Sequence, residues 1–170
     1  HGHHRRQRQM CIRDRKSVIA VDTETSSLNP QEADLVGISL CYEANEAFYI
    51  PVGHTEKTEL KKDIVLKKLK PLLEDPSIKK VGQNIKYDFI IFKNHGIELS
   101  SVEDTMLLSY TLDAGNNRHN MDTLSELHLG HKTISYKDLV GTGKKQLNFS
   151  EVDLKSATEY AAEDLSLIHI

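Results

Sequence analysis

Short apolar runs separated by polar turns dominate the first half of the chain. Residues 18–21 are apolar and mostly β-branched, which predicts a buried central strand. The runs at 35–42 and 47–52 predict two further strands, and the short polar segments between them favour consecutive antiparallel pairing. A fourth strand is predicted at 78–81.

Apolar residues recur at helical spacing in the remaining segments. Residues 59–73 place leucines and isoleucine among lysines, which is typical of an amphipathic helix, and Pro71 is expected to disturb its last turn. Another helix is predicted to follow Gly82 and to stop at Gly96, and Asp122 is expected to cap a later one. The helices predicted in the second half are 104–112, 123–129, 137–140 and 151–164. This element order indicates one α/β domain with a sheet of mixed direction.

Composition and charge fit that interpretation. The chain has 170 residues, of which 38% are hydrophobic and 28% are charged, and no apolar run is long enough to span a membrane. Residues 1–16 carry a net charge of +5 and the rest carry −8, which gives the total of −3. An acidic body does not hold nucleic acid by bulk attraction, although cations could mediate contact with phosphate. Cys11 and Cys41 form no CxxC pair, so the expected location is a reducing cytoplasm.

The first predicted strand ends in two carboxylates. Asp22 and Glu24 are two residues apart, and side chains at positions i and i+2 of a strand point to the same face. Two like charges there repel each other unless a cation lies between them, and magnesium or manganese prefers oxygen ligands. The alternative is a strand that runs into a polar loop with both acids solvated.

Two later segments offer further ligands. Asn84 and Asp88 lie four residues apart at a predicted strand-to-helix junction, where α/β proteins place ligands. A capping asparagine followed by a dipole-stabilising aspartate is the alternative explanation. Tyr160 and Asp164 share one face of the last predicted helix, and an ordinary surface helix is the alternative there. Together the four carboxylates could hold two divalent ions.

In this order, DxE, NxxxYD and YxxxD resemble the three motifs of the DEDD exonucleases, in the subclass with tyrosine in the third motif. The segments DTETSSLNPQEADLVGISL, YIPVGH, LKPLLEDPSIKKVGQNIKYD, DTMLLSYTLDAG, RHNMDTLSE and HKTISYKDLVGTGKKQLNF are similar to the proofreading domain of bacterial DNA polymerase I. The resemblance covers about residues 17–164. It implies a ribonuclease-H-like mixed β-sheet flanked by helices, and a 3′–5′ exonuclease that releases 5′-monophosphates from single-stranded or frayed DNA.

The resemblance also implies residue roles. Two divalent cations, Mg²⁺ or Mn²⁺ with Zn²⁺ as an option at one site, would be held by Asp22, Glu24, Asp88 and Asp164. Asp22 would bridge both ions, and Tyr160 would orient the attacking water. The implied substrate contacts are Thr23 and Asn84 to the terminal nucleotide, Leu28 as a wedge between the last two bases, Arg118 to a phosphate, and Met121 and Tyr136 against bases. Core packing is the alternative for the leucine, the methionine and the tyrosine among these contacts.

Two rival functions stay open on the sequence alone. One is an RNA-trimming exonuclease of the ribonuclease D type, which shares the three motifs. The other is a catalytically inactive nucleic-acid-binding fragment. The implied partners are the 3′ end of single-stranded DNA and a polymerase domain in the full-length parent chain, and we expect a monomer without a membrane partner.

Both ends of the chain are expected to be foreign to the domain. The first nine residues resemble a tag, and MCIRDR (10–15) and LSLIHI (165–170) resemble translations of one transposon-end adapter read in opposite directions. We expect a non-native or disordered leader over 1–16, a C-terminally truncated exonuclease domain over 17–164 and an adapter-like tail. A helix that continues into an unselected tail would hold its catalytic side chains loosely, so weak activity or none is expected of the fragment.

Overall fold

A five-stranded sheet of mixed direction forms the centre of the protein. The computed structural model describes residues 18–56, 58 and 60–170. The strand order is β3-β2-β1-β4-β5, in which β1, β2 and β3 are antiparallel neighbours while β4 and β5 run parallel to β1. The strands are β1 (Val18–Thr25), β2 (Leu35–Glu43), β3 (Glu46–Pro51), β4 (Lys79–Gly82) and β5 (Val102–Asp104). The predicted α/β class and mixed sheet are confirmed.

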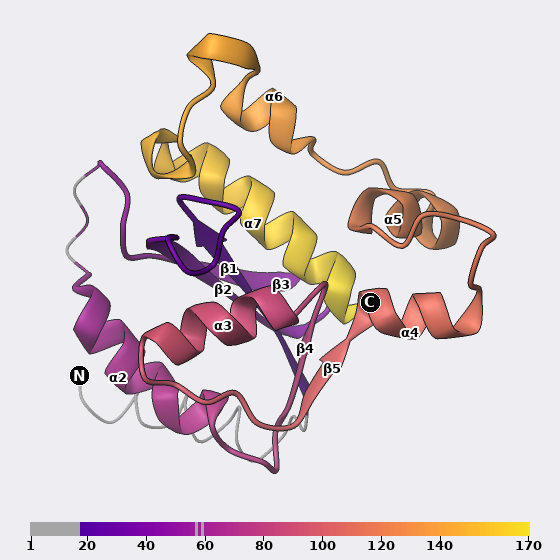
Figure 1. Cartoon of the computed structure of the whole chain (residues 1–170), viewed down its shortest axis with the longest axis horizontal. Coiled ribbons are helices and arrows are strands. Elements are labelled where there is room, and N and C mark those ends of the chain that lie inside the picture. Colours follow the sequence, from indigo (N-terminus) through magenta and orange to yellow (C-terminus); the bar gives the residue numbers. More distant parts are fainter. Residues whose placement is uncertain (1–17, 57, 59) are drawn as a thin grey trace.

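Helices cover both faces of the sheet. Figure 1 shows the sheet between α3 and α7, with α4, α5 and α6 in an arc that leads from β5 round to the start of α7. The helices are α2 (Lys62–Leu73), α3 (Lys86–Asn94), α4 (Thr105–Leu112), α5 (Met121–Leu129), α6 (Tyr136–Val140) and α7 (Leu154–His169), with 3₁₀ turns η1 (Gly143–Lys145) and η2 (Phe149–Glu151). Among the described residues, no helix is both long and apolar enough to cross a membrane.

The central strand is buried on both faces, which explains its unbroken apolar run. Ile19 and Val21 face a large cluster that includes Phe92 of α3 and residues of α2. Ala20 faces the other side, where it packs with Leu165 of α7. Since side chains alternate along a strand, Asp22 and Glu24 lie on the α7 face, as their spacing predicts.

Some predicted boundaries are wrong. Helix α2 begins at Lys62, whereas position 59 lies outside the described residues, and the helix continues two residues past Pro71. Asp122 does not cap α5, because Asn120 is the N-cap and the carboxylate of Asp122 accepts a hydrogen bond from Thr133 instead. The short strand β5 was not predicted.

The last helix also differs from its prediction. Residues 149–151 form the 3₁₀ turn η2, which is closed by a capping box between Asn148 and Glu151, and α7 starts only at Leu154. It then runs on to His169 without a break, and Leu165 and Ile168 are buried. The residues of the expected tail therefore extend the apolar side of α7, because their leucine and isoleucine continue its helical spacing.

Candidate active site

Strand β1 extends beyond its parallel neighbour β4. The paired residues end at Ala20 and Val81, so the following edge of β1 has no strand partner on that side. Asp88, in the first turns of α3, takes this place: its Oδ1 accepts from the Thr23 backbone N–H at 2.9 Å and from the Thr23 hydroxyl. The contact satisfies a backbone donor that would otherwise be orphaned. It holds the carboxylate of Asp88, a residue that is 2% exposed, beside the end of β1. It also engages both the backbone N–H and the hydroxyl of Thr23.

The junction between β4 and α3 is tight. A Cβ at Gly82 would lie 3.0 Å from the Val21 carbonyl oxygen, so glycine lets the two strands stay close. Asn84 has a φ of 58°, in the left-handed region that asparagine tolerates, and its N–H donates to Asp104 at 3.0 Å. The alternative explanation of Asn84 as the capping residue of this helix is wrong, because the N-cap of α3 is Ile85.

These elements surround an open pocket of about 790 Å³ at one end of the sheet. Ten of the eleven predicted site residues line it: Asp22, Thr23, Glu24, Leu28, Asn84, Asp88, Met121, Tyr136, Tyr160 and Asp164. Arg118 lines a separate surface depression with Tyr110 and His119. The structure thus brings together the three motifs and leaves the predicted phosphate contact outside the pocket.

The turn that carries Leu28 stands at the pocket rim. Leu28 is 96% exposed, so the core-packing alternative is wrong for this residue. The Tyr87 hydroxyl donates to the Ser27 carbonyl and shares a hydrogen bond with the Thr25 hydroxyl, each at 2.5 Å. Tyr87 therefore fixes the turn from α3. Sequence reasoning gave it no role, and the only signal was its place directly before Asp88.

The pocket disfavours the charged form of its acids. Burial raises the pKa of Asp22 and Glu24, and their acidic neighbours raise it further. Burial likewise raises the pKa of Asp88 and Asp164 to about 7. The Tyr160 pKa is also raised, first by burial and then by Asp164, so the phenol keeps its proton at neutral pH and donates to Asp164.

The carboxylates do not form a closed cage as they stand. In the part of the chain that the structure describes, no three His, Cys, Asp or Glu side chains are arranged to hold a metal ion. Asp88 is turned toward Thr23, whose backbone N–H and hydroxyl both donate to its Oδ1. The four acids share one pocket, but within the described residues they are not grouped as a ready-made metal site.

Aromatic rings support the third motif. Phe149 of η2 is buried, and its ring centroid lies 6.2 Å from that of Tyr160 and 6.4 Å from that of Tyr136. Tyr136 also meets Tyr160 edge to face, with centroids 6.1 Å apart. These contacts place the Tyr160 ring between the buried cluster and the pocket.

A hydrogen-bonded pair connects β3 to the segment before α7. His54 Nδ1 lies 3.2 Å from the Val152 carbonyl, which can only accept, so Nδ1 carries the proton and Nε2 accepts from the Tyr49 hydroxyl at 2.6 Å. The Tyr49 ring covers Gly37, where a Cβ would lie only 2.1 Å from its hydroxyl oxygen. Gly37 is the strand partner of Glu24, so this link lies next to the acids. Sequence reasoning missed it, although both residues stand in YIPVGH.

Comparison with known proteins decides the family. The sequence profile described as 3′–5′ exonuclease matches residues 7–170. The chain belongs to the 3′–5′ exonuclease family. It is 44% identical over 167 residues to DNA polymerase I of Rhizobium leguminosarum and 46% identical over 153 residues to that of Pseudomonas aeruginosa. Each match covers 86% of this chain but only 16% or 17% of the relative, so the exonuclease chain corresponds to one part of much longer proteins.

A solved structure shows the same fold. Brucella melitensis NrnC with bound Mg²⁺ superposes with a TM-score of 0.69 at 24% identity, over 91% of this chain and 69% of that one. The exonuclease chain thus has the ribonuclease-H-like sheet that its motifs predict, and the predicted resemblance to the exonuclease domain of DNA polymerase I is confirmed.

Proposed function

We propose that this exonuclease domain removes nucleotides one at a time from the 3′ end of single-stranded or frayed DNA and releases 5′-monophosphates. The observation that carries the proposal is the pocket that gathers four carboxylates and Tyr160 at one end of the sheet in a chain of this family. Similarity to DNA polymerase I supports DNA as the substrate and a polymerase domain as the partner in a longer chain.

The donor set fits two divalent cations. Asp22, Glu24, Asp88 and Asp164 offer hard carboxylate oxygens, and their raised pKa values mark negative charge that a cation would neutralise. The Mg²⁺ bound by NrnC supports magnesium or manganese. When bound, such a pair supplies a nucleophilic water and neutralises the leaving alkoxide.

Asp22 is the residue that would serve both ions. Asp88 is the charged neighbour that raises its pKa most, and Asp22 in turn is the one that most raises the pKa of Asp164. Asp22 thus interacts electrostatically with Asp88 on α3 and with Asp164 on α7. Glu24 and Asp164 would complete the ligands of one ion, and Asp88 those of the other.

The remaining residues orient the reactants. Tyr160 keeps its proton, so it would hold the attacking water by hydrogen bonding rather than deprotonate it. The exposed Leu28 would wedge between the last two bases without regard to sequence, while Met121, Asn84 and Tyr136, which line the pocket, would contact the terminal nucleotides. Arg118 would reach a phosphate further along the strand, outside the pocket.

The decisive experiment removes the first motif. Asp22→Ala combined with Glu24→Ala should abolish Mg²⁺-dependent degradation of 5′-labelled single-stranded DNA by the 170-residue chain. A matched pair of exposed carboxylates, changed by Glu32→Ala and Glu126→Ala, should leave it intact. Retained degradation in the first double variant would exclude the mechanism. Faster trimming of a competing RNA oligonucleotide would identify RNA, rather than DNA, as the substrate.

Calorimetric titration of Mg²⁺ and Mn²⁺, with and without a nucleoside monophosphate, tests the metal site even where turnover is weak. Binding that is lost in the Asp22→Ala, Glu24→Ala variant is the expected result. Equal binding by both proteins would place the ions elsewhere.

A further inference from the structure

We propose that Glu163 is a positioning residue, which holds the segment 131–136 against α7 and thereby sets the place of Tyr136 at the pocket rim. We call the contacts between Glu163 and the segment 131–136 the clamp. The clamp is argued from these contacts alone, whereas the role of Tyr136 as a base contact rests on the proposed function. Glu163 lies within the third motif, between Tyr160 and Asp164, but it does not line the pocket.

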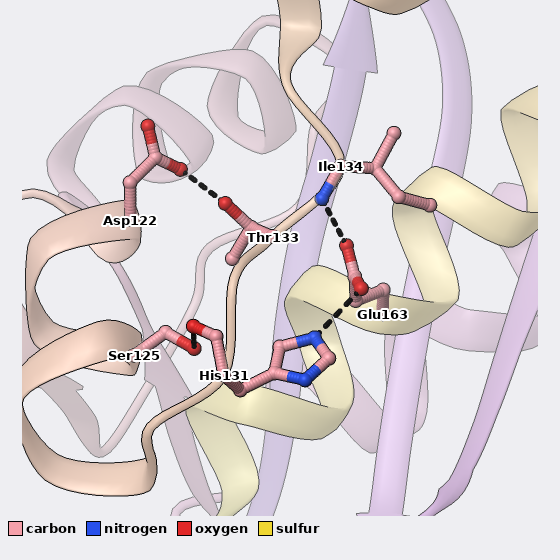
Figure 2. Close-up of polar contacts among 6 residues, drawn as sticks. All are labelled: Asp122, Ser125, His131, Thr133, Ile134 and Glu163. Carbon is pink, nitrogen blue, oxygen red and sulfur yellow. Dashed lines mark hydrogen bonds and ion pairs between the residues drawn. The ribbon is translucent and has the colours of Figure 1, made fainter.

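The Glu163 carboxylate bridges two donors of the segment (Figure 2). Its Oε2 accepts from the Ile134 backbone N–H at 2.6 Å, and its Oε1 accepts from His131 Nε2 at 2.8 Å. Both carboxylate oxygens are therefore engaged by one short stretch of chain. The Glu163 side chain is 19% exposed, which shields these hydrogen bonds better than a fully solvated pair.

The opposite side of the segment is tied to α5. The Thr133 hydroxyl donates to Asp122 at 2.7 Å, and the Ser125 hydroxyl donates to the His131 carbonyl at 2.9 Å. Figure 2 shows the segment passing between Asp122 on α5 and Glu163 on α7. Residues 131, 132, 134 and 136 are all exposed, so polar contacts and the ring contacts of Tyr136, rather than deep apolar burial, fix the path of this segment.

The clamp lies close to the ring that it is proposed to position. Tyr136 follows Ile134 by two residues and meets Tyr160 edge to face, and Tyr160 lies three residues before Glu163 on α7. The ring contact and the carboxylate contacts thus dock the segment onto adjacent positions of one helix turn. Because α7 also supplies Asp164, the clamp fixes Tyr136 relative to the third motif itself.

A single-tryptophan reporter tests the clamp without using catalysis. The chain has no tryptophan, so Tyr136→Trp introduces a single tryptophan at the rim. In that background Glu163→Ala should lower the steady-state anisotropy and increase quenching by acrylamide, because the segment is released. Glu159→Ala is the matched control: it removes an exposed carboxylate one turn earlier on α7, whose ion partner is Lys155 on the same helix. Equal anisotropy in the Glu163 and Glu159 variants would overturn the clamp, whether or not the chain degrades DNA.

Kinetics test the link to substrate. With Tyr136 in place, Glu163→Ala should raise KM for single-stranded DNA by about tenfold, which is the scale of a stacking contact between a base and an aromatic ring, and should change kcat much less. Combined with Tyr136→Ala, it should add no further increase. His131→Ala should also raise KM, although it leaves every charge on α7 unaltered. A rise in KM in this variant therefore cannot come from a changed charge next to Asp164.

Additive KM effects in the Glu163→Ala, Tyr136→Ala pair would overturn the link to Tyr136. Far-UV circular dichroism and the thermal midpoint identify any variant that fails to fold, and the His131→Ala variant then carries the same test. If degradation does not depend on Asp22 and Glu24, the proposed function is wrong. The anisotropy result still decides whether Glu163 holds the segment.

Discussion

The sheet region (described residues within 18–104) and the helical arm (105–151) are held in place by different forces. In the sheet region a single cluster buries residues such as Leu73 and Phe92 completely. In the arm, α4 has no buried residue, α5 buries only Ser125 and α6 only Val140. Apolar packing therefore fixes the first region, while caps and side-chain hydrogen bonds fix much of the second.

The difference divides the proposed site in the same way. Three of the four carboxylates come from β1 and α3 of the sheet region, and the fourth comes from α7, which packs on the sheet. Arg118, Met121 and Tyr136 come from the arm. We expect the acids to keep their positions while the arm adapts to the bound strand, because local opening is easiest where few apolar contacts must break.

The largest effect should come from the sheet core. Phe92→Ala should lower the free energy of unfolding by about 3–5 kcal/mol, because it removes a fully buried ring. Leu112→Ala in α4, where the side chain is 86% exposed, should change it by less than about 0.5 kcal/mol. Urea unfolding followed by circular dichroism measures both. Similar losses in the two variants would erase the contrast between the regions.

Next in size is the charge in the pocket. Without divalent cations at pH 8, Asp164→Asn should raise the free energy of unfolding by about 2 kcal/mol, because it removes a carboxylate whose charged form is disfavoured first by burial and then by Asp22. Mg²⁺ should then stabilise the variant less than the parent chain. Thermal melts in EDTA and in Mg²⁺ measure this, with Asp138→Asn on α6 as the control. A destabilised variant in EDTA would contradict the account.

A smaller, pH-dependent effect is expected at the link between β3 and the segment before α7. Burial lowers the pKa of His54, so the folded state binds its proton less readily than the unfolded chain. Its contribution to stability is full above pH 6.5 and is lost as the pH falls through the lowered value. The thermal midpoint of the parent chain should therefore fall more steeply between pH 7 and pH 5 than that of His54→Asn. Parallel curves would show that His54 is not buried in its neutral form.

The smallest effect belongs to the arm. Thr133→Val removes the hydrogen bond to Asp122 and should cost about 0.5 kcal/mol or less. Hydrogen exchange of the amides near residue 133 should accelerate while those of β1 stay unchanged. Equal acceleration in both places would mean that the arm opens only together with the sheet.

The sheet and the three motifs were predictable because their signals are local. An apolar β-branched run followed by Asp22 and Glu24 predicts a buried strand, and the spacing of the two acids predicts that they lie on the same face of it. Helical spacing in the same way ties Tyr160 to Asp164. These relations depend on two or four neighbouring residues, and the surrounding fold preserves them.

Other features depend on distant partners and left no local trace. Strand β5 has three residues and exists through its pairing with β4. The positive φ of Asn84 belongs to a junction that Asp104 stabilises from twenty residues away. Glu163 gains its partners from a segment about thirty residues earlier in the chain. Patterns in a single sequence do not reveal contacts between residues that are far apart along the chain.

The early end of β4 has a wider consequence. Had that strand run two residues further, backbone amides and carbonyls would have filled the flank of β1 where Asp88 now stands. Regular pairing and space for chemistry thus compete for the same hydrogen-bonding groups. The protein forgoes part of its β-ladder, and the missing strand pairing leaves space for the pocket beside β1.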